Sequence, residues 1–261
     1  MNKYDVVIQA LEKDISLITN KDDYELSVDA FKGHRSRYLD QIKLISRQLK
    51  KGKVLDIGAS PYHLMYCLKK LGFDIYGVDI NPNTLKEFQM KHRLKVKKHN
   101  MENGKSPFKD EEFDLVIFTE IFEHLGVDPL RVLKEIRRIL KPKGMLFLST
   151  PNLYTLHKII MFLFGRSFNN ALGELNKVKS TGYMGHIREY SNKEIKMILE
   201  SCGYKIKEIY FKKYNNFFLA PSIVRKTPLF FLGLMFEFIT NSISFLRPTQ
   251  IVIAEKEKDI R

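Results

Sequence analysis

The chain has 261 residues, of which 44% are hydrophobic and 28% charged, an ordinary globular composition that can bury a sizeable core. Its two cysteines, Cys67 and Cys202, form neither a disulfide framework nor a metal-ligand pattern, and the opening residues MNKYDVVIQALEKD lack the apolar stretch of a secretory signal. We therefore expect a cytoplasmic protein without a metal site. The formal net charge of +14 comes from dispersed lysines and arginines, so a solvated basic surface and an anionic or membrane-bound partner both stay open.

Residues 1–50 are expected to be helical. In the stretch HRSRYLDQIKLISRQLKKG, apolar side chains recur every three or four residues, at Tyr38, Ile42, Ile45 and Leu49. This spacing is typical of a helix that lays one face along a sheet. We interpret 1–50 as an N-terminal helical segment ahead of the main domain, 51–261.

From residue 53 to residue 150 the pattern alternates between strands and helices. Apolar runs predict strands at 53–58, 74–80, 93–100, 113–120 and 145–150. Helical patterns lie between them, at 61–72, 81–92 and 128–144. Asn81 and Asp128 are the expected N-caps of the second and third helices, each followed by proline, and a Pro/Gly stop ends the third. This alternation predicts right-handed βαβ units in a doubly wound, Rossmann-like α/β fold.

Two insertions are expected in the rest of the chain. The first, about 152–190, is irregular, as a segment that covers a site would be, and the second, about 212–247, is rich in apolar residues. The regular elements expected around them are a helix at 191–204 and strands at 204–211 and 249–258. Ser191 and Glu194 form a predicted capping box at the start of that helix.

Polar or small residues follow four consecutive strands of the predicted sheet. They are Gly58 after the first strand, Asp79 at the end of the second (79 − 58 = 21 residues later), Asn100-Met101-Glu102 after the third and Thr119-Glu120-Ile121 at the end of the fourth. Ligands of such sheets bind beyond the carboxyl ends of the strands, where a glycine lets the backbone approach and an acid at this distance reaches a ribose diol. A single feature of this kind also fits a turn or a helix cap. Four at one edge predict a nucleoside-binding site.

The loop after the first strand indicates which nucleoside. Dinucleotide-binding loops carry several glycines, so that a pyrophosphate can rest on a helix N-terminus. Here Gly58 is followed by Ala59, Ser60, Pro61 and Tyr62. Proline removes an N–H that a phosphate would use, and tyrosine fills the space of a pyrophosphate. The loop therefore favours a ligand without phosphates, such as adenosine that bears an amino acid.

Several motifs resemble those of class I S-adenosylmethionine-dependent methyltransferases. They are VLDIGAS, GVDIN, FDLVIFTEIFEHL, RVLKEIRRILKPKGMLFLSTPN and HIREYSNKEIKMILESCGY, and they occur in order over roughly residues 35–211. The likeness is strongest to the small-molecule branch that includes ubiquinone and glycan O-methyltransferases. It implies a seven-stranded sheet whose last strand is antiparallel, with S-adenosylmethionine as cofactor and S-adenosylhomocysteine as product. The reduction of the glycine-rich loop to Gly-Ala-Ser is a departure from the family pattern.

The resemblance also implies roles for single residues. Asp56 and Gly58, Ala59 and Ser60 would approach the methionine part of the cofactor, and Asp79 the ribose hydroxyls. Ile80 and Met101 would contact the adenine faces, and Asn100 the adenine amine. Glu120, Ile121 and His124 would line the methionine side or the mouth of the acceptor site.

Methyl transfer from a sulfonium is an in-line displacement, so the protein mainly aligns the acceptor and excludes water. A hydroxyl acceptor also benefits from a base within hydrogen-bond reach. The predicted catalytic residues are His124, in FEHL, and His186 and Arg188, in GHIREYS. The alternative for His124 is a hydrogen bond that pins its loop, and for Arg188 a carboxylate partner that anchors the insertion.

The acceptor is narrowed by motifs that the chain lacks. TEIFEHL stands after the fourth strand, in place of the D/N-P-P-Y/F motif of base-amine methylation, and both cysteines lie in predicted helices rather than in the site. Nucleic acid is therefore a disfavoured partner. STPN, after the fifth strand, resembles members that act on sugars, quinones or lipid-linked compounds. We predict O-methylation of a small-molecule, glycan or lipid-linked acceptor.

The apolar segments LHKIIMFLFG and PLFFLGLMFEFITNSISFL admit three interpretations: core packing, a homodimer interface, or a surface for peripheral contact with the inner face of a membrane. Polar residues interrupt the second segment, so we do not expect it to span a bilayer. The flanking residues Lys212, Lys213, Arg225, Lys226 and Arg247 would suit an anionic bilayer.

Three rival functions remain. A binding or scaffold protein with the same fold but without catalysis, and an RNA methyltransferase, would share the predicted sheet. A nicotinamide-dependent oxidoreductase would share the acid after the second strand, but it needs phosphate-binding glycines that are absent here.

Overall fold

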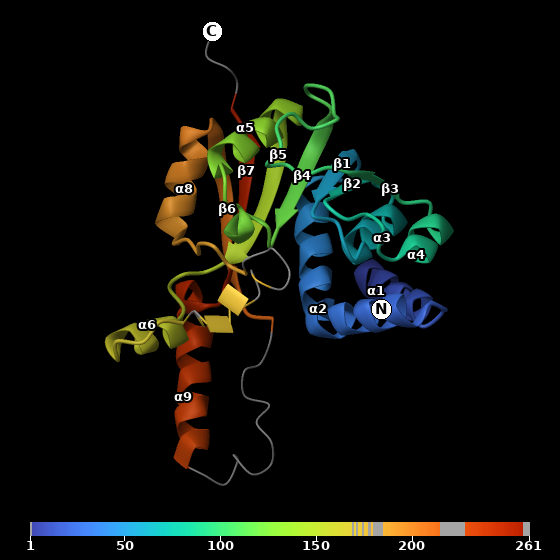
Figure 1. Cartoon of the computed structure of the whole chain (residues 1–261). Helices are drawn as coiled ribbons and strands as arrows, with labels where there is room; N and C mark the ends of the chain where they lie inside the picture. Colours follow the sequence, from blue (N-terminus) through green and yellow to red (C-terminus); the bar gives the residue numbers. More distant parts are fainter. Residues whose placement is uncertain are drawn as a thin grey trace.

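A computed structural model describes residues 2–168, 185–214 and 228–257, together with residues 170, 172, 173, 175, 176 and 179. Its centre is one seven-stranded sheet with the strand order β3-β2-β1-β4-β5-β7-β6 (Figure 1). The strands are β1 Lys53–Ile57, β2 Asp74–Asp79, β3 Lys95–Lys98, β4 Phe113–Thr119, β5 Leu140–Pro151, β6 Tyr204–Lys212 and β7 Thr249–Lys256. The first five are parallel, and β7 runs antiparallel to both β5 and β6. The predicted doubly wound fold and its antiparallel last strand are confirmed.

Helices cover both faces of this sheet. The described helices are α1 Lys3–Ile15, α2 Lys21–Gln48, α3 His63–Lys70, α4 Lys86–Lys91, α5 Pro129–Ile139, α6 Leu156–Leu163, α8 Asn192–Ser201 and α9 Pro228–Ser242, with 3-10 turns η1 Phe122–His124 and η3 Ser244–Leu246. Asp128 caps α5, and Ser191 with Glu194 forms the capping box of α8, both as predicted. Helices α1 and α2 account for most of residues 2–50, where helical structure was predicted.

Alternate residues of the central strands feed two separate hydrophobic cores. In β4, Leu115 and Ile117 pack with α1, α2 and α3 on one face, whereas Val116 and Phe118 pack with α5 and α8 on the other. All four side chains are fully buried. Because both faces of this central strand are covered by helices, these successive side chains are all buried, which explains the nearly continuous apolar run FDLVIF. Because helices cover both faces of the sheet, a ligand-binding site can form only at the ends of its strands.

Two predicted helix boundaries are wrong. The second predicted helix does not start at Asn81: α4 begins only at Lys86, after Leu85 in a left-handed conformation. Tertiary contacts hold this turn, because the Leu85 N–H donates to Asp23 Oδ1 of α2 at 2.9 Å. The third predicted helix ends at Ile139 rather than near Gly144, since its last carbonyls accept N–H groups from the turn before β4.

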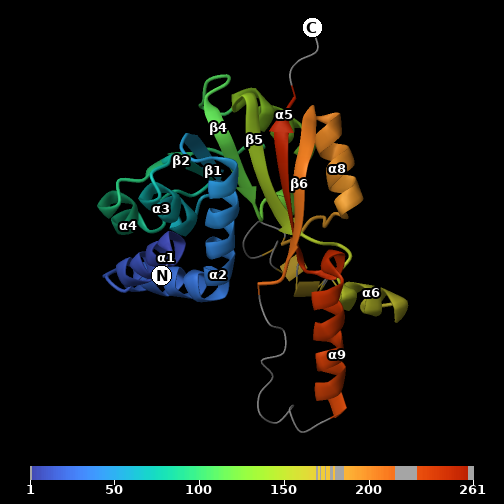
Figure 2. The same cartoon turned by 180° about the vertical axis from the view of Figure 1, so that it is seen from behind.

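Two helices from the predicted insertions project from the sheet. Helices α6 and α9 lie beyond the carboxyl ends of the parallel strands, away from the C-terminus (Figure 2). Their exposed apolar side chains include Phe162, Leu163 and Phe164 from α6 and its end, and Met235 and Phe238 from α9. Within the described residues, no helix combines the length and the hydropathy that crossing a membrane requires.

The basic residues predicted to face an anionic bilayer are largely engaged within the chain. Lys212 pairs with Asp40 at 2.9 Å and Lys213 with Glu237 at 3.0 Å. Arg247 donates to the main-chain oxygen of Asn241 at 2.7 Å. Arg225 and Lys226 lie outside the described residues. Membrane contact therefore stays a prediction that rests on the apolar side chains rather than on charge.

His63, the first residue of α3, should make stability depend on pH. It is fully buried, its Nε2 lies 2.7 Å from Ser27 Oγ, and burial lowers its pKa from 6.5 to about 3. Because the unfolded chain binds this proton more readily, its stabilising effect is present above pH 6.5 and is lost as the pH falls toward 3, by about 1.4 kcal/mol per pH unit. Urea unfolding between pH 7 and 4 is expected to show a shallower loss of stability for His63→Gln than for the wild type. The other titrating groups are common to both proteins, so equal slopes would contradict the assignment.

Candidate active site

Two adjoining cavities open at the carboxyl ends of β1, β2 and β4. The larger has a volume of about 520 Å³ and the smaller about 240 Å³, and both are lined by Gly58, Ser60 and Ile121. The two cavities lie side by side at the sheet edge where the sequence predicts a nucleoside.

Asp79, at the end of β2, is the buried carboxylate of the larger cavity. Its Oδ2 accepts the Ser60 N–H at 3.0 Å, and its Oδ1 accepts the Asn81 N–H at 2.8 Å. These bonds fix the carboxylate, while each oxygen keeps lone-pair capacity toward the cavity. The arrangement can accept two hydroxyl groups of a ribose.

The other predicted nucleoside contacts line the same cavity. Met101 is buried and Ile80 is half exposed, and both offer apolar surface to the cavity that they line. Asn100 Oδ1 accepts the Glu102 N–H at 2.9 Å, which leaves its amide NH₂ to other partners. His99 also lines the cavity, and its buried Nε2 has no hydrogen-bond partner among the described residues. Apolar surface together with polar groups of this kind suits a planar base.

The loop after β1 has its N–H groups occupied. Gly58 and Ala59 both donate to the carbonyl of Val78, at 2.9 and 3.2 Å, and Ser60 donates to Asp79. The Tyr62 N–H donates to Ala59 O at 2.7 Å. A pyrophosphate needs such N–H groups as donors, so this loop favours a ligand without phosphates.

Gly58 is required for a different reason than predicted. We expected its missing side chain to let a ligand approach the backbone. In the structure, a Cβ at Gly58 would stand 2.3 Å from Ile121 Cδ1, and its φ of +69° is left-handed. The glycine therefore makes room for Ile121, which forms the wall shared by the two cavities.

The smaller cavity contains charged groups of both signs. Asp56, at the end of β1, is buried, and both its burial and the nearby Asp79 raise its pKa to about 8. Arg37 of α2 places Nη1 3.4 Å from Glu120 Oε2, and its buried Nε has no hydrogen-bond partner among the described residues. Glu120 and Arg37 provide one negative and one positive group, and Asp56 a further polar one, so this cavity can hold an amino acid, whose ammonium and carboxylate need opposite charges.

Arg37 is a site residue that the sequence analysis missed, together with His34 and Tyr38 of the same helix. The stretch HRSRY was interpreted only as the surface of a helix, and Tyr38 as part of its apolar face. The cluster of cationic and aromatic residues in that stretch was the one available signal. Its position opposite β1 depends on how α2 packs on the sheet.

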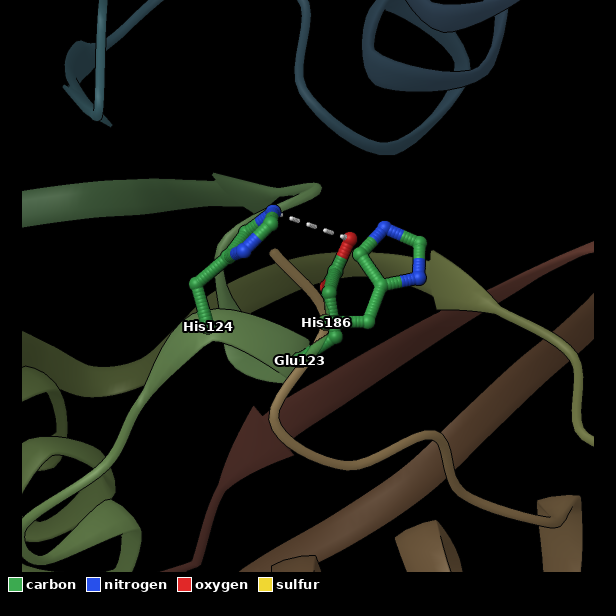
Figure 3. A group of neighbouring side chains, drawn as sticks. All are labelled: Glu123, His124 and His186. Atoms are coloured by element: carbon green, nitrogen blue, oxygen red, sulfur yellow. Dashed lines mark ion pairs between the residues drawn. The ribbon is translucent and has the colours of Figure 1, made fainter. Parts of the chain in front are cut away.

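Glu123, His124 and His186 form a cluster (Figure 3), and His124, which lines the larger cavity, places this cluster at the rim of that cavity. Glu123 is buried, and desolvation together with the nearby Glu120 raises its pKa to about 7. The rings of His124 and His186 lie 5.1 Å apart between centroids. A hydrogen bond that His186 Nδ1 donates to the carboxylate of Glu189 raises the pKa of His186. Two of the three predicted catalytic residues are thus brought together.

Arg188, the third predicted catalytic residue, points elsewhere. Its Nη2 donates to Glu194 Oε1 of the α8 capping box at 2.7 Å, and it lines neither cavity. Tyr190 beside it is buried against Phe122, with ring centroids 4.7 Å apart. This geometry fits the alternative that Arg188 anchors the insertion.

The fold and the cavities define a class I, Rossmann-like methyltransferase, because the donor set fits each part of S-adenosylmethionine. Asp79 suits the ribose, Met101 and Ile80 the base, and Arg37 with Asp56 the amino acid. Residues 31–209 match the methyltransferase domain family. The chain belongs to that family, and its cofactor is S-adenosylmethionine.

Individual relatives agree with this assignment. An uncharacterised protein from Methanocaldococcus jannaschii is 31% identical over 202 residues, which cover 76% of this chain and 74% of that protein. A ubiquinone biosynthesis O-methyltransferase from Actinobacillus pleuropneumoniae is 29% identical over 146 residues, 50% of this chain and 58% of that enzyme. A SAM-dependent methyltransferase from Archaeoglobus fulgidus has a similar fold, with a TM-score of 0.61 at 20% identity, over 88% of this chain and 98% of that one.

Proposed function

We propose that the protein transfers a methyl group to a hydroxyl of a small-molecule, glycan or lipid-linked acceptor. The observation that carries this proposal is the pair His124 and His186 at the rim of the cofactor cavity, next to the buried Glu123. A hydroxyl acceptor needs a group that takes its proton, and a neutral imidazole at the cavity mouth provides one. The likeness to ubiquinone biosynthesis O-methyltransferases supports the same chemistry.

Each part of the site has a role in this reaction. The bound cofactor supplies an activated methyl group on a sulfonium. Asp79 and Arg37 would hold its two ends. A histidine at the rim would accept the acceptor's proton as the methyl group passes from the donor sulfur to the acceptor oxygen. Ile121 forms the wall shared by the two cavities.

The class of acceptor is supported by two helices at the cavity end of the sheet. Helices α6 and α9 project at this end and expose Phe162, Leu163 and Phe238 (Figures 1 and 2). Apolar side chains at the end of the molecule that holds the cofactor site favour a lipid-linked or otherwise apolar acceptor held at a membrane surface. A second copy of the chain is the other partner that such a surface fits.

The test is transfer of a tritiated methyl group from S-adenosylmethionine to fractionated lysate, with nucleic acid, lipid, glycan and small-molecule pools counted separately. We expect alkali-treated label to stay in the lipid, glycan or small-molecule pool, because methyl ethers resist hydrolysis. Asp79→Ala, assayed at a low cofactor concentration, serves as the control with weakened cofactor binding. Label confined to RNA would support the rival RNA methyltransferase, and cofactor binding without labelling of any pool would support a non-catalytic protein.

A further inference from the structure

We propose that Glu123, His124 and His186 bind one divalent transition-metal ion at the rim of the cofactor cavity. Each residue offers one ligand atom, and the three atoms lie within 4.8 Å of one another. Metal–ligand bonds of about 2.0–2.2 Å place neighbouring ligand atoms about 3–4 Å apart, so small side-chain rotations close the site. Figure 3 shows the carboxylate of Glu123 between the two imidazoles.

The second polar atom of each ligand is already held by another group. Glu123 Oε2 accepts the Thr150 hydroxyl at 2.9 Å. His124 Nδ1 lies 2.7 Å from the main-chain oxygen of Gly185, and His186 Nδ1 lies 3.0 Å from Glu189 Oε1. These bonds assign the ring protons to Nδ1 and direct Nε2 of both histidines to the cluster. Outer hydrogen bonds of this kind orient the ligands of protein metal sites.

The remaining oxygen of Glu123 gives a second, independent indication of a ligand. Glu123 is 1% exposed, and its Oε1 accepts no hydrogen bond from any described residue. The nearest side-chain nitrogen of a basic residue is His124 Nε2, 3.9 Å away, the contact drawn as a dashed line in Figure 3. A buried carboxylate oxygen without a partner is costly, and a metal ion between the three side chains would satisfy it.

The ligand types select the class of metal. Two imidazoles and one carboxylate suit zinc, iron, cobalt or nickel, whereas magnesium and calcium prefer sites made of oxygen. Three protein ligands leave coordination positions open. His124 lines the larger cavity beside Ile121, so the open positions face the space in front of the cofactor.

A catalytic role for the ion rests on the proposed function, whereas the binding of the ion to the cluster does not. An ion at this place would polarise the acceptor oxygen and lower the pKa of its hydroxyl. The proton would pass to solvent as the C–O bond forms and the donor's C–S bond breaks. The two histidines would then hold the ion rather than act as the base. No metal site was expected from the sequence, because His186 stands 62 residues (186 − 124) after the FEH segment.

Metal binding is tested directly on the full chain without an affinity tag. The protein is treated with a chelator, desalted, and titrated with Zn²⁺ or Mg²⁺ by calorimetry, and Co²⁺ binding is followed by its visible spectrum. We expect one Zn²⁺ per chain, no binding of Mg²⁺ at the same concentrations, and a Co²⁺ spectrum typical of mixed nitrogen and oxygen ligands.

Variants connect the binding to the cluster. Glu123→Gln keeps the shape and the acceptor for Thr150, and His186→Gln alters a half-exposed residue, so at least the second should fold. Both are expected to weaken Zn²⁺ binding at least 100-fold, and Glu189→Gln, one bond further out, by about 10–100-fold. His157→Gln, on the exposed side of α6, is the matched control and should bind as the wild type does.

The outcomes separate the two proposals. Absence of Zn²⁺ and Co²⁺ binding, or equal affinity in wild type and His186→Gln, overturns the metal site. If metal-free protein transfers methyl groups at the full rate, the catalytic role of the ion fails while the proposed O-methyl transfer stands. If metal binds at the cluster but no acceptor pool is ever labelled, the proposed function fails while the metal site stands.

Discussion

Replacement of Asp79 by alanine is expected to weaken S-adenosylmethionine binding by about 10- to 150-fold. Hydrogen bonds to a charged group contribute about 1.5–3 kcal/mol, and each factor of ten in affinity corresponds to about 1.4 kcal/mol. The carboxylate also fixes the Ser60 and Asn81 N–H groups, so its loss loosens the loop around the ribose. Calorimetry with S-adenosylmethionine and S-adenosylhomocysteine measures the change.

Two further variants sharpen this experiment. Asp79→Asn keeps the acceptor oxygen but removes the charge, so it should fall between the wild type and Asp79→Ala. Asp74→Ala is the matched control, because Asp74 begins the same strand at the opposite edge of the sheet and pairs with Lys95 on the surface. An unchanged affinity in Asp79→Ala would show that the ribose is held elsewhere.

Replacement of Asn152 by alanine is expected to lower the free energy of unfolding by about 3 kcal/mol. This residue is buried, and the two N–H groups of its Nδ2 are shared among the main-chain oxygens of Tyr154, Phe245 and Arg247, at 3.2, 2.7 and 2.9 Å, while its Oδ1 accepts the Tyr154 N–H at 3.1 Å. Each lost bond costs about 1 kcal/mol, and more where an acceptor stays buried. Urea unfolding followed by circular dichroism measures the change.

The comparison variant is Asn103→Ala, at an exposed turn, which should stay within about 0.5 kcal/mol of the wild type. A similarly small change for Asn152→Ala would mean that the three carbonyls find water instead. The result also bears on STPN, which was interpreted as a sign of the acceptor class. In the structure, its asparagine joins the end of β5 to the segment before β7, which is a structural role.

The sheet was predictable because each strand carries its own signal. Residues such as those of β4 are apolar on both faces, and the capping residues Asp128 and Ser191 act within their own helices. These are local properties, and they are visible in a short window of sequence. The polar residues at the strand ends followed from the fold, because parallel strands bring their carboxyl ends to one edge.

The features that could not be predicted depend on contacts between segments far apart in the sequence. The start of α4 is set by Asp23 of α2, 62 residues earlier in the chain. Arg37 enters the cofactor site only because α2 crosses beside β1 and Glu120 (Figure 1). His186 and Glu123 come together through a segment whose spacing shows no periodicity. No local pattern encodes such pairs, so sequence reasoning named residues at both ends of the cofactor site but missed the α2 side chains at its amino-acid end.

The packing of α2 means that the start of the chain cannot be exchanged independently of the sheet. Arg37 and Tyr38 form one wall of the smaller cavity, while Asp56 and Glu120 form the opposite wall. In a chimaera that joins residues 51–261 to the leading helices of a relative, the amino-acid tail of the cofactor would therefore be bound in part by the relative's helix. Selectivity between S-adenosylmethionine and cofactor analogues altered in that tail should then follow the donor of the helix, while selectivity for the nucleoside follows the donor of the sheet.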